Sequence, residues 1–180
     1  MKDNILFTPH FALLEFTESP TAKKYGIENT PPEEAVENLK NLCVGTLEPL
    51  REALGLPVII TSGYRCKALN DILTHASGSS QHLKGQAADF YVGWCAPLRG
   101  RGQSGPSSGS GIGSSPRERL IKAFRLIITN EKIDYDQLIL YPDFIHVSFV
   151  SRASNRRKII KASGKGTYCA LTRGDALVLA

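Results

Sequence analysis

The sequence predicts an α+β fold in which a small antiparallel sheet is flanked by helices. Two stretches, residues 31–54 and 116–128, repeat apolar residues at the spacing of an amphipathic helix. Short runs rich in β-branched residues lie between and after these helices, and the last two runs are separated by only a few residues. One-faced helices combined with a hairpin of short strands are the parts of an α+β domain.

The first long helix is expected to begin at Pro31 and to end before Gly55. Thr30 can cap this helix, Pro31 suits the first helical position, and Glu33 completes a capping box. Gly55 supplies a stop signal, and the preceding residues 8–29 are expected to hold short helices and loops. The apolar residues that recur at helical spacing, and would form the core face, are Val36, Leu39, Leu42, Cys43, Leu47, Leu50 and Leu54.

Strand and turn signals alternate in the middle of the chain. Residues 57–61 form a β-branched run that predicts a buried strand, and residues 62–65 predict a turn at its end. A short helix is expected over residues 66–73, and a loop of small residues over 74–81. Residues 87–92 predict a second strand.

The segment that follows is almost entirely Gly, Ser, Pro and Arg over residues 100–115. Such a composition cannot bury apolar surface, so we expect a flexible loop at about residues 99–115. Candidate site residues lie on both sides of this loop, so residues 1–180 are interpreted as a single domain. A tolerated surface insertion is favoured here over a lid on a substrate cleft.

The last part of the chain predicts a helix and a hairpin. Residues 135–141 and 144–150 are typical of two strands, and the intervening Pro142 and Asp143 suit an antiparallel turn. The helix begins at Pro116, and its apolar positions are Leu120, Ile121, Phe124, Ile127 and Ile128.

Composition and charge limit the class of protein. The chain is 42% hydrophobic and 22% charged, which is typical of a soluble globular protein, and no apolar run approaches the length of a membrane span. The net charge of +5 is interpreted as a solvated basic surface, with a polyanionic target (nucleic acid or an anionic cell wall) as the alternative. Few aromatics interrupt the densest basic stretch, so nucleic acid is not expected as a partner; its members are Arg152, Arg156, Arg157, Lys158, Lys161 and Lys165.

The cysteine pattern contains no C-x-x-C pair. We therefore expect free thiols, with Cys43 acting as a small core residue. The four cysteines are Cys43, Cys66, Cys95 and Cys169.

Two histidines and one aspartate predict a metal centre. His82 and Asp89 lie in one block, and His146 lies on the last predicted strand, facing away from its apolar neighbours. A zinc ion with three protein ligands keeps a fourth position open, which distinguishes catalytic zinc from structural zinc. A second carboxylate, Asp143, lies three residues before His146, where a general base would be needed.

The spacing of His82 and Asp89 fits a turn rather than one face of a helix. A histidine in a loop, a tight return at Gly85 and a following strand would bring the aspartate back. Each residue alone has a simpler interpretation, such as a surface histidine or a turn carboxylate. Asp89 lies in an apolar strand, however, and burial of a carboxylate there is unfavourable unless it is paired or metal-bound.

Several segments together resemble a known family. They are Ile60-Thr61-Ser62-Gly63-Tyr64-Arg65, Leu69-Asn70, Ser80-Gln81-His82-Leu83-Lys84-Gly85-Gln86-Ala87-Ala88-Asp89 and Ile145-His146-Val147-Ser148. Over residues 11–161 the chain is similar to the zinc D-Ala-D-Ala carboxypeptidase family, which includes phage L-alanyl-D-glutamate endolysins. That family shares its fold with the hedgehog signalling domain. The block S-x-H-x-x-G-x-A-x-D, followed by H-x-S on a strand, carries the resemblance.

The resemblance implies a role for each matching residue. One Zn²⁺ ion would be bound by His82, Asp89 and His146. Asp143 would be the catalytic acid, and Arg65 would stabilise the oxyanion that develops on the substrate. The substrate-binding candidates are Arg65, Ser80, Tyr64, Gln81 and Ser148.

The implied function is that of a zinc metallopeptidase acting on a peptidoglycan stem peptide, with a hedgehog/DD-peptidase-like fold whose small sheet carries the zinc site. A phage or prophage endolysin-like enzyme is favoured, as an L-Ala-D-Glu endopeptidase or a D-Ala-D-Ala carboxypeptidase. A non-catalytic, zinc-containing module that binds the cell wall is the alternative, although Asp143 and Arg65 argue against it. We expect a monomer, made in the cytoplasm without a signal peptide, that acts on the cell wall once exported or released.

Overall fold

The computed structural model describes residues 4–74, 76–93, 115–163 and 166–179. The Gly/Ser-rich loop predicted at about residues 99–115 therefore lies, except for Ser115, outside the described residues. No helix within the described ranges is long and apolar enough to cross a membrane.

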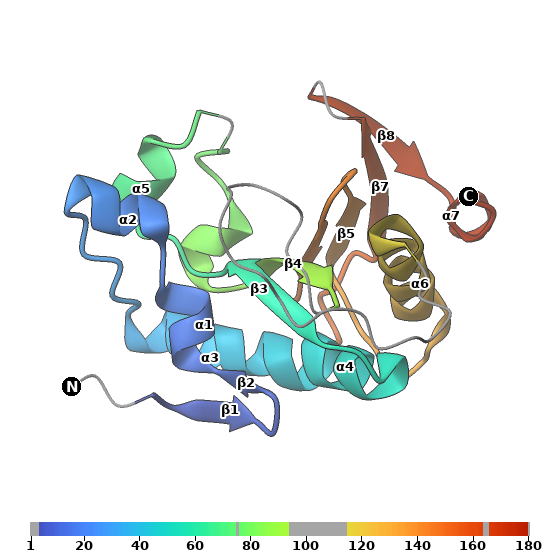
Figure 1. Cartoon of the computed structure of the whole chain (residues 1–180), viewed down its shortest axis with the longest axis horizontal. Coiled ribbons are helices and arrows are strands. Elements are labelled where there is room, and N and C mark those ends of the chain that lie inside the picture. Colours follow the sequence, from blue (N-terminus) through green and yellow to red (C-terminus); the bar gives the residue numbers. More distant parts are fainter. Residues whose placement is uncertain (1–3, 75, 94–114, 164–165, 180) are drawn as a thin grey trace.

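A six-stranded sheet forms the centre of the fold, with strand order β3–β4–β6–β5–β7–β8 (Figure 1). All neighbouring strands are antiparallel except β5 and β7, which run parallel. The predicted α+β class is confirmed, as is the predicted hairpin, which is formed by β5 and β6. The strands are β3 (Val58–Ser62), β4 (Ala87–Val92), β5 (Gln137–Leu140), β6 (Ile145–Ser148), β7 (Lys158–Ser163) and β8 (Thr167–Leu171).

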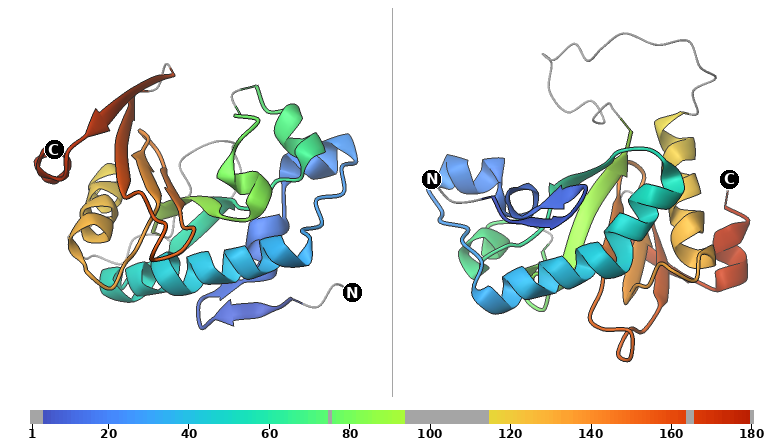
Figure 2. Two further views of the ribbon diagram at one scale, coloured as in Figure 1. Left: turned by 180° about the vertical axis from the view of Figure 1, so that it is seen from behind. Right: turned by 90° about the horizontal axis from the view of Figure 1, so that it is seen from below.

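Helices cover one face of this sheet. A long helical rod crosses beneath the sheet, and α6 packs beside this rod, as Figures 1 and 2 show. The rod consists of α3 (Glu33–Leu42), a π-helical turn (Cys43–Leu47) and α4 (Glu48–Leu54), and α6 spans Pro116–Thr129. Fully buried residues of both helices and of the strands, such as Leu39, Phe124 and Phe90, belong to the same core.

The start of the long helix differs from the prediction. The helix begins at Glu33 with Pro32 at its N-cap, and the hydroxyl of Thr30 donates to the Glu28 carboxylate, 2.9 Å away. A residue that precedes proline is disfavoured in the helical region, which acts against Pro31 at the first helical position, because Pro32 follows it. The predicted capping box at Thr30 was therefore wrong.

The predicted single helix is also interrupted by the π-helical turn. Pro49 has no amide hydrogen, so it cannot donate to the carbonyl of Gly45 in the preceding turn. That carbonyl accepts instead from the amide of Asp134, at 3.0 Å, and the Thr46 hydroxyl donates to the carbonyl of Asp134. The widened turn thus attaches the rod to the segment that leads into β5.

The N- and C-terminal regions complete the fold. The expected short helices before the rod are α1 (Leu13–Thr17) and α2 (Pro20–Tyr25), and they follow a small hairpin of β1 (Leu6–Thr8) and β2 (Phe11–Ala12). The β7–β8 ribbon and α7 (Arg173–Leu177) had no counterpart in the prediction. Between β3 and β4 lie α5 (Lys67–Asp71) and the 3₁₀ turn η2 (Gln81–Lys84).

The two faces of the sheet differ in character. Residues Ala88, Phe90, Ile145 and Val147 point into the main core. Their neighbours Asp89 and His146 alternate with them and therefore point to the opposite face, which we call the site face.

Candidate metal centre

Asp89 and His146 are brought together by strand pairing. Asp89 of β4 is the direct register partner of His146 of β6, and residues opposite each other in an antiparallel pair project to the same face. His146 Nδ1 lies 2.8 Å from Asp89 Oδ1. The prediction that His146 faces away from its apolar neighbours is confirmed, since both Ile145 and Val147 are fully buried.

His82 reaches the same point from the η2 turn. Ser80 caps this turn, and its Oγ accepts from the amide of His82. Gly85 ends the turn with φ +68°, a left-handed conformation that favours glycine, and the chain then enters β4. The loop-turn-strand arrangement predicted for the block that holds His82 and Asp89 is thus the observed one.

The imidazole of His82 is held in one orientation. Its Nδ1 lies 2.6 Å from the carbonyl oxygen of Gly63, which can only accept, so Nδ1 carries the hydrogen and donates. Nε2 of the neutral ring is therefore left with a free lone pair, directed at Asp89 and His146. A hydrogen bond from the remote ring nitrogen is the usual way in which a metal-ligating histidine is oriented.

The three side chains form a compact donor set. His82 Nε2 lies 3.2 Å from His146 Nδ1 and 3.4 Å from Asp89 Oδ1. All three ligand atoms lie within 4.8 Å of one another. Two ligand atoms at ~2.0 Å from a tetrahedral zinc ion are separated by roughly 3.3 Å, so the spacings from His82 fit such an ion.

The local electrostatics keep these groups in the forms that bind a cation. Burial lowers the pKa of His82, although the charge of Asp89 acts in the opposite direction, so the ring is neutral near neutral pH. Burial alone would raise the pKa of Asp89, but His82 and His146 more than offset it and hold that pKa well below its ordinary value. A neutral imidazole and an ionised carboxylate are what metal ligation requires.

Arg65 places a positive charge beside this group. Its Nη2 lies 3.9 Å from Asp89 Oδ2, and its backbone amide donates to the carbonyl of His82 at 3.1 Å. Burial lowers the pKa of Arg65 while Asp89 raises it, and a guanidinium remains charged under both influences. Its Nε is buried without a hydrogen-bond partner among the described residues, which makes it an available donor.

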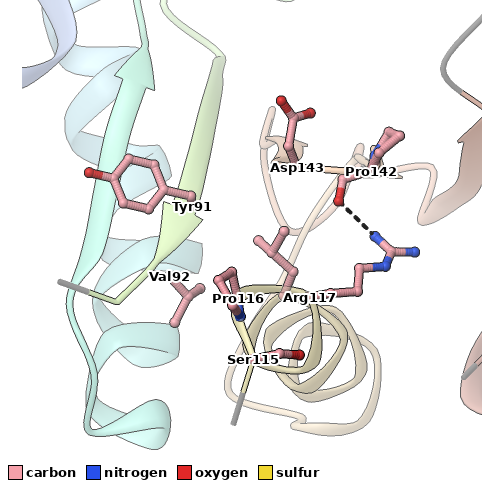
Figure 3. A pocket seen from close by; sticks show the side chains of 8 residues that line it. Tyr91, Val92, Ser115, Pro116, Arg117, Pro142 and Asp143 are labelled. Carbon is pink, nitrogen blue, oxygen red and sulfur yellow. Dashed lines mark hydrogen bonds between the residues drawn. The ribbon is translucent and has the colours of Figure 1, made fainter. Parts of the chain in front are cut away.

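Asp143 lies in the turn between β5 and β6. The turn is closed by a hydrogen bond from the Tyr141 amide to the Phe144 carbonyl, at 3.0 Å. Arg117 of α6 donates from Nη1 to the carbonyl oxygens of Tyr141 and Pro142, at 2.8 and 3.4 Å. Asp143 lines a hollow of about 270 Å³, and Figure 3 shows its carboxylate pointing away from Arg117.

The other substrate-binding candidates lie at different depths in the structure. Tyr64 is buried in the main core, and burial raises the pKa of its hydroxyl. Ser148 is fully buried, and its Oγ accepts from the backbone amide of Gln137 at 3.0 Å. Gln81 donates to Asp136 Oδ2 at 3.0 Å, and Ser80 is partly exposed beside His82. Their roles in substrate binding stay predictions.

The sequence did not predict an ion pair between the buried Asp136 and the half-exposed Arg156. Asp136 is 1% exposed and accepts from the backbone amide and Nε of Arg156, at 2.8 and 2.9 Å. Because Gln81 also donates to Asp136, the pair supports the turn that carries His82. The sequence does show that Asp136 lies next to a buried strand, where a carboxylate needs a partner. No sequence feature near Arg156 identifies it as that partner.

Comparison with known proteins gives one family match. The family model described as Peptidase M15 matches residues 9–118. This range is more than half of the chain and includes Arg65, His82 and Asp89, while Asp143 and His146 lie beyond it. No curated protein matches the chain.

Proposed function

Because the chain belongs to the peptidase M15 family, whose members are zinc D-Ala-D-Ala carboxypeptidase-like metallopeptidases of peptidoglycan, we propose that it is a zinc-dependent peptidase that hydrolyses peptidoglycan stem peptides. The single observation that carries the proposal is the convergence of His82, Asp89 and His146 beside a partly buried arginine.

We assign one Zn²⁺ ion to His82, Asp89 and His146. Two imidazole nitrogens and one carboxylate oxygen are a ligand set that zinc prefers, and the lone pair of His82 is already directed at the group. When bound, zinc supplies a Lewis acid that polarises the scissile carbonyl and makes water more acidic.

Asp143 is proposed as the group that moves the proton. It would accept the proton of the attacking water and then pass it to the leaving amine, as a general base and general acid in turn. Support comes from its place in a short turn anchored at both Tyr141 and Pro142, which limits the positions that the carboxylate can reach.

Arg65 is proposed to stabilise the negative charge that develops on the carbonyl oxygen. A fixed donor in a partly buried site acts more strongly than one in water and needs no reorganisation during the reaction. The side chain of Arg65 is 14% exposed, and its unpartnered Nε can donate without breaking an existing hydrogen bond within the described part of the chain.

Within this function, we favour an endolysin-like enzyme that acts on the cell wall after export or release. Its scissile bond would be L-Ala-D-Glu or D-Ala-D-Ala. A zinc-containing module that binds the wall without hydrolysing it is the second candidate. Catalysis is favoured because Arg65 lies beside Asp89 and because the chain has a carboxylate, Asp143, three residues before His146.

The test is mass spectrometry of defined muropeptides incubated with the zinc-loaded protein, beside a chelated sample. Chelator-sensitive cleavage is the expected result. Loss of the terminal D-Ala identifies a carboxypeptidase, and release of the stem after L-Ala identifies an endopeptidase. Bound zinc without cleavage of any muropeptide would favour the wall-binding module.

The Asp143→Asn variant should retain zinc and lose turnover by roughly 10²–10⁴-fold, because it removes a proton carrier and no ligand. His82→Ala should lose both zinc and activity, because it removes a ligand. Metal analysis and kinetics on the same preparations separate the two effects. Equal zinc loss in Asp143→Asn would show that Asp143 is a ligand instead.

A further inference from the structure

The site face of the sheet continues beyond the metal group onto aromatic residues. Ile139 of β5 is the register partner of His146, and Tyr141 lies two residues further along the same strand direction. Phe144 lies two residues before His146. Since side chains two apart on a strand share a face, Tyr141 and Phe144 extend the face that holds the metal group.

A third aromatic residue joins them from the C-terminal ribbon. Tyr168 of β8 is the register partner of Ala162 of β7, and Ala162 belongs to a small buried cluster on the site face, against which Tyr141 packs. Figures 1 and 2 show this ribbon beside β5, the strand that pairs with β6 on its other edge.

The three rings form a defined arrangement, which we call the aromatic shelf (Tyr141, Phe144 and Tyr168). The rings of Tyr141 and Phe144 are stacked, with centroids 4.2 Å apart and planes at 11°. Tyr168 meets Tyr141 edge-on, at 6.3 Å and 89°, and the two hydroxyls lie 3.3 Å apart. Tyr168 is 55% exposed, so this edge of the shelf is open to solvent.

The shelf adjoins the metal group along β5 and β6. Burial raises the pKa of the Tyr141 hydroxyl most, followed by its contact with Tyr168 and the negative charge of Asp89, and Arg65 acts in the opposite direction. Phe144 directly follows the proposed proton carrier, Asp143. Tyr141 and Phe144 are each two residues along the chain from the Ile139–His146 pair, a distance of roughly 7 Å, so a ligand that occupies the metal group can touch the shelf with an adjoining part.

We propose that the aromatic shelf binds the sugar to which the stem peptide is attached, so that the protein recognises a glycan-linked peptide rather than a free one. The inference rests on the proposed function and names a further part of its substrate. A pyranose presents a C–H face that packs against an aromatic ring and a rim of polar groups that bonds to tyrosine hydroxyls.

The chemistry of the stem peptide favours a sugar as the occupant. The alanine and glutamate residues next to the candidate scissile bonds carry no large apolar side chain that would fill a surface of three rings. The N-acetylated sugar lies one residue away from an L-Ala-D-Glu bond, and several residues away from a terminal D-Ala-D-Ala bond. Occupation of the shelf therefore favours the endopeptidase.

Kinetics on paired substrates test the shelf. One substrate is a disaccharide-linked stem peptide and the other is the same peptide without sugar. A ring contact is worth about 0.5–1.5 kcal/mol, so Tyr168→Ala should lower kcat/KM for the sugar-linked substrate by about 2–12-fold, mainly through KM. The free peptide should be cleaved as by the unmodified protein, and Tyr168→Phe should retain most of the preference.

Tyr25→Ala is the matched control, because Tyr25 is similarly exposed, at 59%, but lies on α2, away from the β7–β8 ribbon (Figure 1). It should behave as the unmodified protein on both substrates. An equal effect of Tyr168→Ala on the two substrates, or no effect on either, would overturn the shelf while leaving the peptidase activity established.

A binding measurement keeps the inference testable without cleavage. The peptide-free disaccharide is titrated into protein with labelled tyrosines and followed by proton–carbon NMR. Saturable shifts of the Tyr168 and Tyr141 ring signals, with Tyr25 unchanged, are expected. Absence of these shifts overturns the shelf, and their presence in a protein that cleaves nothing would overturn the peptidase proposal alone.

Discussion

His82 shows how a single hydrogen bond decides what a residue can do. Its side chain is 1% exposed, and the carbonyl of Gly63 takes up its Nδ1 hydrogen. The remaining nitrogen can then only accept a hydrogen bond or ligate a cation. The residue type and its block predicted a ligand, whereas the carbonyl that orients it belongs to another segment and carries no sequence signal.

Arg117 holds the turn that carries Asp143, and its substitution gives a specific prediction for catalysis. Arg117→Met removes both hydrogen bonds to the turn that holds Asp143. We expect kcat to fall about tenfold or more, because a small displacement of Asp143, the proposed proton carrier, is costly, while zinc content and KM change little. Steady-state kinetics and metal analysis of the purified variant measure these quantities.

Arg125→Met provides the control for Arg117→Met. Arg125 lies on the same helix and also donates to a backbone carbonyl, that of Leu179, near the C-terminus. Its loss should leave kcat unchanged in the folded protein. Arg117→Lys, which retains one donor, should recover part of the activity. A similar loss of kcat in both methionine variants would indicate a general effect on α6.

Among the elements, the η2 turn depends on Gly85, the residue at which it ends. A Cβ at this position would lie 2.3 Å from the carbonyl oxygen of Ala35 on α3, in addition to the strain of φ +68°. Gly85→Ala should lower the free energy of unfolding by roughly 2–4 kcal/mol, from left-handed strain and overpacking together. It should also weaken zinc binding, because η2 carries His82. Urea unfolding and zinc titration measure the two effects.

Gly55→Ala measures the cost of the left-handed backbone strain without a steric clash. Gly55 ends α4 at φ +63°, and a Cβ added there would meet no atom of the described, non-adjacent residues within 4 Å. Its cost should be about 1–2 kcal/mol, with unchanged zinc affinity. Equal costs in the two variants would show that the helix can move away from Gly85.

The elements differ in how far their sequence determines them. The strand over residues 87–92 has the predicted bounds, and α6 begins at the predicted residue, Pro116. Both sequence patterns are local and uninterrupted. The π-helical turn depends on a hydrogen bond that replaces the one that Pro49 cannot donate. Its donor is the amide of Asp134, which is distant in sequence. The β7–β8 ribbon was missed because β8 is largely exposed and lacks an apolar alternation.

At the scale of the whole molecule, Asp136 joins β5, η2 and the segment before β7. Burial raises its pKa, but the hydrogen bonds from Arg156 and Gln81 more than offset this and hold the pKa below its ordinary value. A carboxyl group with a depressed pKa in the folded state adds stability above its unfolded pKa of about 3.9, and that stability is lost as the pH falls through the folded value.

Asp136→Asn should therefore destabilise the protein by roughly 1–2 kcal/mol at about pH 7, a modest cost because Arg156 is half exposed. The difference from the unmodified protein should shrink below about pH 4. Urea unfolding across this range, in chelator to exclude metal binding, measures it. Asp71→Asn, which breaks only an exposed pair with Lys67, should have little effect at any pH. A difference that is independent of pH would contradict the assigned role of the charge.

The site of this protein is assembled from parts that are remote along the chain. Asp89 and His146 are 57 residues apart, and only the pairing of β4 with β6 brings them together. Such long-range pairings are among the slower events of folding. A nascent or partly folded chain would therefore hold no complete ligand set, and the ability to hydrolyse a peptide would arise only as the sheet closes. An ion taken up at that moment would link the two halves of the chain across β4 and β6.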